Sequence, residues 1–263
     1  MLTFTHTYLL NLAYQKLNRK VIPENEGELI LGNVLPDFIT HLGRTKFQAM
    51  AHDLAFFNRL NHLNSLEWGA IFHILCDNFS TIGKITFEGS YDRIPKNGFI
   101  EKLAQQIVIN ITLHIPKRRV LQCAFDIFVI RENRQLLIRL LKIAEDFLQA
   151  IFSNVIQRMS TIFGLESNRL IIGLQRFSKI YGKDFVEQAA SEQYRLFPLV
   201  RSLLNLDTLT DPSQILAGIQ NHPELMELVE LNMELIENNW HELLEETVGE
   251  VLKYTDLKQF LKE

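Results

Sequence analysis

The apolar residues of this chain recur at intervals of three and four along almost its whole length. This spacing constrains the fold more than any other feature, because it places apolar side chains on one side of a helix and polar side chains on the other. The first such stripe is formed by Leu9, Leu10, Ala13 and Leu17. No convincing run of alternating apolar and polar residues predicts a strand. The sequence therefore predicts an all-α fold.

Local signals predict where several helices begin. Capping-box patterns occur at 45–48 (TKFQ) and 64–67 (NSLE), where the first side chain can cap the helix and the fourth can bond back to it. They predict one helix that carries His52 and another that carries His73 and Asp77.

Two further signals divide the chain. The triplet Leu35-Pro36-Asp37 predicts a helix start, since Pro fits the first turn and an acid is stabilised at its positive end. Residues 82–99 are rich in Gly, Pro, Asn and Asp and predict a loop or short hairpin. Long helices are expected beyond residue 100, with residues 147–156 continuing the helix that contains 137–143. The last segment, 223–262, predicts an exposed amphipathic helix pair.

Length and charge limit the classes of protein to consider. A chain of 263 residues suits one large domain or two small ones, and we predict a single all-α domain with a metal-site part (1–100) and a helical part (100–263). The net charge of −4 comes without a basic stripe, so there is no strong signal for nucleic-acid binding. Neither a signal peptide nor an apolar stretch of about 18 residues is seen, so no transmembrane segment is expected. With only two cysteines, a cytoplasmic location is expected.

His73 and Asp77 form the strongest candidate for a functional pair. They are four residues apart on the expected helix, so both side chains point to one face among largely apolar neighbours. A buried charge is costly without a partner. A metal ion is one possible partner and a plain His–Asp hydrogen bond is the other, and we favour the metal.

Four short sequence motifs follow one another near the start of the chain. They are Thr5-His6 at a helix start, the segment GNVLPD (32–37), His52, and the segment GAIFHILCD (69–77). Together they resemble the zinc-dependent phospholipase C family, which includes single-strand nucleases of the same all-helical fold. The resemblance covers about residues 1–80. It implies a zinc-activated water that hydrolyses a phosphate ester or phosphodiester, in a small molecule or a phospholipid.

The resemblance also implies a set of zinc ligands. The first ion would be held by Asp37, His52, His73 and Asp77. The second would share Asp77 with His6, and the amino group of Met1 is an open candidate for that ion. Asp37 and Asp77 are the residues to which the resemblance gives a catalytic role.

The chain departs from the family where a third zinc is expected. Gly83 stands near the position of one missing His, and His241 with Glu245 has the required spacing only far downstream. This departure favours a rival reading, in which a non-catalytic member of the fold acts as a binding or scaffold module.

The same residues also allow other interpretations. His41 follows Asp37 by four and could substitute as a ligand, although we expect it to face solvent or to cap a helix end. His52-Asp53 could indicate an HD-type phosphohydrolase, but the surrounding pattern fits poorly. The segment LGNVL-x-DF is also similar to the start of acyl-carrier-protein phosphodiesterases, which likewise cleave a phosphodiester with a metal.

Overall fold

All regular structure described in the computed structural model is helical, and none of the described residues forms a strand, which confirms the all-α prediction. The described residues are 3–18, 20, 22, 26–39, 53–60, 63–80, 117–150, 152–163, 166–168, 171–172, 190–191, 193–196, 199–200 and 212–262. The elements are α1 (Thr3–Asn18), α2 (Gly27–Ile39), α4 (Leu54–Phe57), α5 (Ser65–Phe79), α8 (Lys117–Ala150), α9 (Phe152–Phe163), the 3-10 helix η5 (Gln193–Leu196), α13 (Pro212–Asn221), α14 (Glu224–Ile236), α15 (Trp240–Val251) and α16 (Thr255–Phe260).

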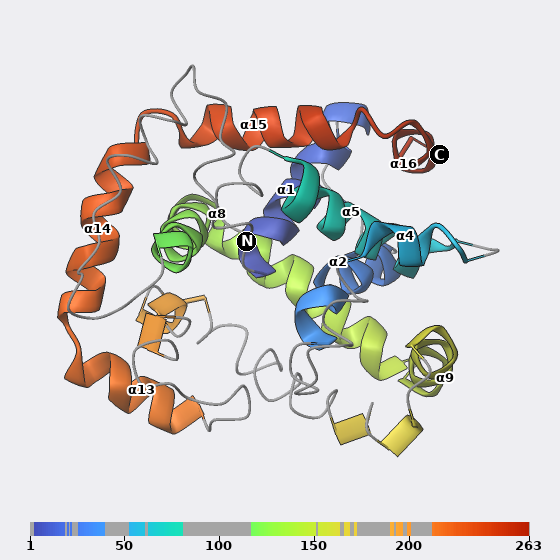
Figure 1. Ribbon diagram of the computed structural model, residues 1–263, viewed down its shortest axis with the longest axis horizontal. Helices are drawn as coiled ribbons and strands as arrows, with labels where there is room; N and C mark the ends of the chain where they lie inside the picture. The colour runs from blue at the N-terminus through green and yellow to red at the C-terminus, as the bar shows by residue number, and fades with distance from the viewer. Residues whose placement is uncertain are drawn as a thin grey trace.

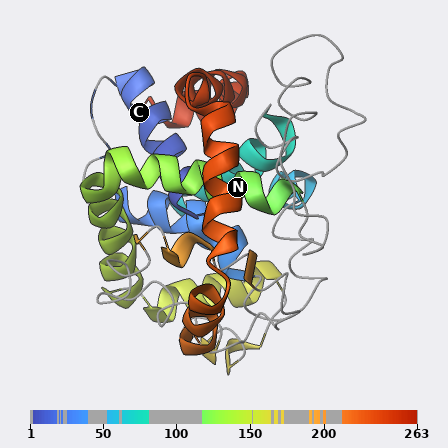
Figure 2. The same ribbon diagram turned by 90° about the vertical axis from the view of Figure 1, so that its left-hand side faces the viewer.

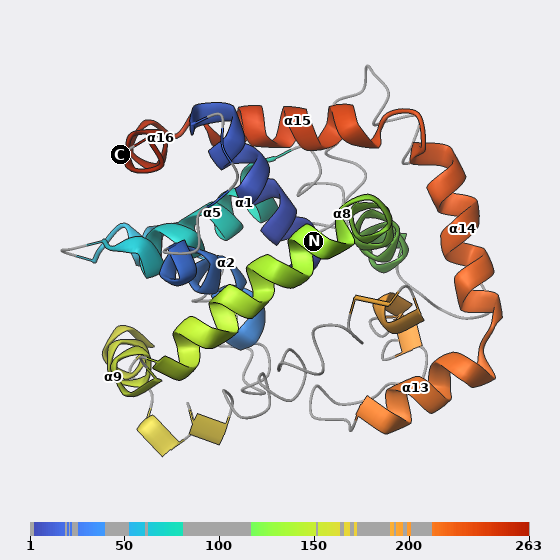
Figure 3. The same cartoon turned by 180° about the vertical axis from the view of Figure 1, so that it is seen from behind.

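Helices α1, α2, α5 and α8 form the centre of the molecule, and the carboxy-terminal helices lie around it (Figure 1). Figure 2 looks onto the side covered by α14, and Figure 3 shows α8 crossing the molecule from behind. The amino end of α1 lies in the interior in perpendicular views (Figures 1 and 2), and Thr3, Phe4 and Thr5 are all buried. A helix start in this place must find partners for its polar groups within the protein.

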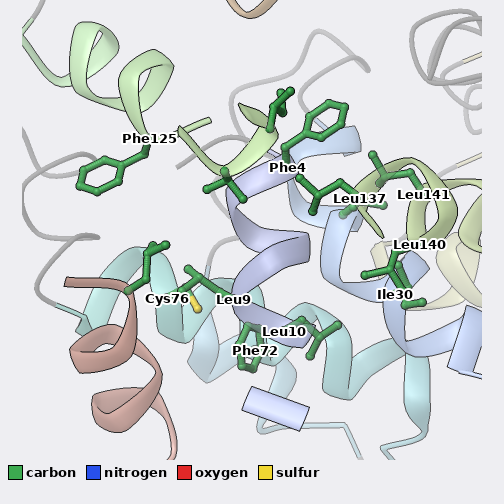
Figure 4. Close-up of a cluster of buried hydrophobic side chains, with 14 of the residues drawn as sticks. Phe4, Leu9, Leu10, Ile30, Phe72, Cys76, Phe125, Leu137, Leu140 and Leu141 are labelled. Carbon is green, nitrogen blue, oxygen red and sulfur yellow. The ribbon is translucent and has the colours of Figure 1, made fainter. Parts of the chain in front are cut away.

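A single apolar cluster joins the central helices. Phe4 and Leu9 of α1, Phe72 of α5 and Phe125 of α8 are fully buried in it, and Figure 4 shows these and neighbouring side chains. Helices α14 and α15 also contribute apolar side chains to this cluster. The carboxy-terminal segment is therefore amphipathic as predicted, although it forms α14, α15 and the short α16 instead of a pair.

Two glycines let α2 and α5 approach closely. A Cβ atom on Gly32 would lie 2.0 Å from the Leu66 carbonyl oxygen, and one on Gly69 would lie 2.2 Å from the Leu29 carbonyl oxygen. Atoms cannot approach so closely, so only glycine fits at either crossing point. The contact places the turns that follow, which carry the predicted site residues, directly opposite one another.

The prediction of a helix start at Pro36 is wrong. Helix α2 already begins at Gly27, with Glu28 in its first turn, and Pro36 lies inside it. A proline in this position removes the N–H that would bond to the Gly32 carbonyl, which loosens the helix near its end. Asp37 consequently lies near the negative, carboxy-terminal end of α2 and not at a positive start.

Other helix limits agree with the sequence in part. Asn64 and Glu67 form the predicted capping box of α5, with both reciprocal hydrogen bonds present. The expected continuation through 147–156 is wrong, because α8 ends at Ala150 and α9 begins at Phe152; α8 itself bends at Asn133. The predicted loop at 82–99 and the helix start at 45–48 lie outside the described residues. Among the described helices, none is both long and apolar enough to cross a bilayer.

Candidate metal centre

Three helices bring four of the predicted site residues together. Helix α1 supplies His6, α2 supplies Asp37, and α5 supplies both His73 and Asp77. The side chains of His6, His73 and Asp77 are at most 1% exposed, whereas that of Asp37 is 25% exposed. The cluster is therefore closed on its inner side and reaches solvent at Asp37.

The orientation of His73 is set by the backbone of α2. Its Nδ1 lies 2.7 Å from the Asn33 carbonyl oxygen. A carbonyl can only accept, so Nδ1 carries the hydrogen and Nε2 of the neutral ring presents a lone pair. Metal-binding histidines are commonly held by such a bond on the nitrogen away from the ion.

Nε2 of His73 faces two carboxylates. It lies 3.4 Å from Asp77 Oδ2 and 3.9 Å from Asp37 Oδ1. Burial alone would lower the pKa of His73, but the negative charges of Asp37 and Asp77 outweigh burial and raise it. A lone pair and two carboxylates at this separation need a positive charge, either a proton on Nε2 or a metal ion.

His6 stacks against His73, with ring centroids 3.7 Å apart and an angle of 15° between the planes. Its Nε2 lies 3.1 Å from Asp77 Oδ1 without hydrogen-bond geometry, and neither ring nitrogen makes a hydrogen bond to any residue that the structure describes. Burial, together with His73, lowers the pKa of His6 to about 4, although Asp77 acts in the opposite direction. His6 is thus a neutral imidazole with an unused lone pair in a buried place, where polar atoms are normally satisfied.

Asp77 lies between the two imidazoles. One carboxylate oxygen faces His6 and the other faces His73. Burial would raise the pKa of Asp77, but the positive charge at the amino end of the chain and the contacts with both histidines hold it well below its usual value. The Asp77 carboxylate is therefore ionised, with Oδ1 next to His6 and Oδ2 next to His73.

The dimensions of the cluster suit a metal ion. One ligand atom from each of His6, Asp37 and His73 lies within 4.8 Å of the others, and no second group of this kind occurs among the described residues. Neighbouring ligands around a tetrahedral zinc are about 3.4 Å apart. The contacts of 3.1, 3.4 and 3.9 Å in this cluster lie on both sides of that value. The negative end of α2 next to Asp37 adds a further attraction for a cation.

The remaining predicted residues do not join this cluster or cannot be placed. His52, His41 and Met1 lie outside the described residues. His241 lies 3.2 Å from Glu132 on the surface, and Glu245 pairs with Lys16 at 3.0 Å. These two residues of α15 therefore make ion pairs away from the cluster.

Sequence reasoning missed two contributors to the cluster. One is the backbone carbonyl of Asn33, which has no side-chain signature. The other is Thr3, whose hydroxyl donates a long hydrogen bond of 3.4 Å to Asp37 Oδ2. The GN dipeptide at 32–33 was a partial signal, since a glycine there permits the close approach that brings the carbonyl to His73.

Comparison of the chain with protein families, with curated proteins and with solved structures finds no match. The case for a function therefore depends on the geometry of this cluster and on the residue pattern.

Proposed function

We propose that the chain is a zinc-dependent hydrolase of a phosphate ester or phosphodiester, with His6, Asp37, His73 and Asp77 as its metal ligands. The observation that carries the proposal is the convergence of two buried imidazoles and two carboxylates from three helices, in which His6 makes no hydrogen bond with the described part of the chain. The phospholipase C-like pattern of the sequence supports the same proposal. We further propose a cytoplasmic location and, as substrate, a small phosphate ester or a phospholipid.

The ring geometry favours two ions over one. The two imidazoles are nearly parallel, so their lone pairs run side by side and do not point to a common centre. Asp77 offers one oxygen to each ring, which is what a bridging carboxylate does. In this arrangement Asp37 and His73 would hold one ion and His6 would hold the other, with the Asp77 carboxylate available to both.

When bound, two zinc ions lower the pKa of a bound water and neutralise charge on phosphate oxygens. The protein's own groups supply the rest. Asp37 is the exposed carboxylate of the cluster, so it can accept the proton that the attacking water gives up, while Thr3 orients it. The buried His6 and His73 exclude bulk water from the inner side, which strengthens the electrostatic interactions there.

A non-catalytic binding or scaffold module is the second candidate function. The observation that favours it is the position of His73 Nε2, 3.9 Å from Asp37 and 3.4 Å from Asp77, because a proton on this nitrogen can satisfy both carboxylates without any metal. The same two carboxylates raise the pKa of His73. In that case the cluster is a buried charge network that specifies how α1, α2 and α5 meet.

Metal content and turnover, measured together, separate the two candidates. Protein purified without chelator should hold at least about one zinc per chain, as a three- or four-ligand site predicts. With zinc added, it should hydrolyse bis-nitrophenyl phosphate or short-chain phosphatidylcholine. His73→Ala should lose both properties. His241→Ala is the matched control, because this histidine is exposed and pairs with Glu132, so it should lose neither. A protein that holds no zinc after zinc is added back refutes the proposal. One that keeps zinc but acts on no phosphate ester supports the binding module.

A further inference from the structure

A buried carboxylate on α8 caps the amino end of α1. The first four N–H groups of a helix have no acceptor within the helix. One of these groups, the Thr5 N–H, donates to Asp126 Oδ1 at 2.8 Å, and the Thr5 hydroxyl donates to the same oxygen at 2.6 Å. Asp126 follows Thr5 by 121 residues, so the cap comes from a distant part of the chain.

Asp126 has a buried counter-ion. Its Oδ2 lies 3.4 Å from Nη1 of Arg195 in η5, and Asp126 and Arg195 are 0% and 2% exposed. The Arg195 guanidinium also lies 4.4 Å from the centre of the Phe4 ring, on the first turn of α1. Burial raises the pKa of Asp126, although Arg195 and Thr5 act against it, so the ion pair is retained at an energetic cost.

A buried ion pair is weak evidence for stability and is better understood by what it orients. Here it orients the residue directly before His6. The bond from the Thr5 N–H to Asp126 constrains both the rotation of α1 about its axis and its position along that axis. The next side chain must then stack on His73 at 3.7 Å and meet Asp77 at 3.1 Å. A functional cluster tolerates errors of only about 0.5 Å in such positions.

We infer that Asp126, held by Arg195, is a positioning residue of the metal centre: it anchors the amino end of α1 so that His6 meets Asp77 and His73. This inference rests on the proposed metal site. Asp126 contacts neither histidine in any hydrogen bond described above, so it acts only through Thr5 and α1.

Cobalt(II) binding to the full chain tests the inference, because the visible absorption of cobalt reports both affinity and ligand geometry. Asp126→Asn should weaken binding by about 10- to 100-fold, the usual effect of removing a residue that orients a ligand. Thr5→Val removes the hydroxyl contact and should weaken binding in the same direction. Thr5→Ser keeps that contact and should restore affinity to within about twofold of the wild type.

Glu67→Gln is the matched control. Glu67 is also a buried carboxylate at a helix start with an arginine partner, Arg158 at 2.9 Å, but it lies well before His73 on α5. It should reduce stability and leave the cobalt affinity and spectrum unchanged.

Three results would overturn the inference in distinguishable ways. If the wild type binds no cobalt, the proposed metal site itself fails. If the wild type binds but Asp126→Asn and Thr5→Val bind equally well with the same spectrum, only the positioning role fails. The same holds if affinity falls in Glu67→Gln as much as in Thr5→Val, because the loss then follows stability. Should Asp126→Asn not fold, the comparison of Thr5→Val with Thr5→Ser decides.

Discussion

Adding a methyl group where α2 and α5 cross should disturb both the fold and the candidate metal centre. In Gly69→Ala the new Cβ would lie 2.2 Å from the Leu29 carbonyl oxygen and 2.6 Å from the Asn33 nitrogen. Both atoms belong to the backbone of α2, so no side-chain rotation relieves the clash. The two helices must separate by roughly 1 Å, and forcing an extra methyl group into such a contact costs about 1–3 kcal/mol or more.

The same separation should weaken the cluster. His73 Nδ1 is 2.7 Å from the Asn33 carbonyl oxygen, and a further ~1 Å exceeds the range of a hydrogen bond. The orientation of His73 towards Asp37 and Asp77 would then be lost. Gly69→Ala should therefore reduce both the free energy of unfolding and the zinc affinity.

Gly249→Ala is the matched control, because a Cβ at Gly249 on α15 meets nothing within 4 Å. Alanine is the better helix former by up to about 1 kcal/mol, so this variant should be slightly stabilised. Urea unfolding gives the stability, and calorimetric titration with zinc gives the affinity. If Gly69→Ala is as stable as Gly249→Ala, the close helix crossing is refuted. If Gly69→Ala loses stability but keeps the zinc affinity of the wild type, the role of the Asn33 carbonyl is refuted.

Three further predictions concern titration and ligand removal. The pKa of His6 falls from 6.5 to about 4 in the folded protein. Between these two pKa values the unfolded chain binds a proton at His6 and the folded chain does not. The free energy of unfolding of the metal-free protein should therefore fall by up to about 3 kcal/mol as the pH drops from about 6.5 to about 4. His6→Asn should lack this part of the slope; an identical slope in wild type and variant would contradict it. Since the pKa of His73 is raised, zinc binding should release a proton near neutral pH, seen as a heat that depends on the buffer; a buffer-independent heat would argue against His73 as a ligand. In the zinc-loaded protein, Asp77→Asn and His6→Ala should both abolish turnover, but only Asp77→Asn should clearly lower the melting temperature, because Asp77 contacts both histidines.

The fold class and the start of α5 were predictable because they depend on local signals. The capping box at Asn64 and Glu67 acts within one turn, and the apolar spacing decides which face of a helix is buried. His73 and Asp77 share a face for the same reason.

Pro36 shows where local signals fail. Proline is common in the first turn of a helix, but here α2 begins nine residues earlier, at Gly27, and Pro36 lies inside it. Gly32 and Gly69 allow α2 to pack closely against α5, but these glycines do not indicate where α2 begins. The bond from Asp126 to Thr5 joins positions 121 residues apart, and a lone aspartate in a helix gives no sign of its partner.

The convergence of the four ligands lies between these cases. The spacing and order of His6, Asp37, His73 and Asp77 suggested a shared site through a resemblance to a family. The distances among them depend on the close contact between α2 and α5 at Gly32 and Gly69. Both glycines are visible in the segments GNVLPD and GAIFHILCD, but the sequence does not show that the two helices meet there.

Anomalous scattering from crystals of the zinc-loaded protein, measured on both sides of the zinc absorption edge, shows whether His6, Asp37, His73 and Asp77 bind zinc. We expect an anomalous peak at about 2.0–2.2 Å from Asp37 and from Nε2 of His73, the distances that zinc makes with oxygen and nitrogen. A second peak is expected next to His6, with Asp77 between the two. No peak at the cluster, with His73 Nε2 instead hydrogen-bonded directly to a carboxylate, would refute the metal centre and leave the four residues as a structural charge network.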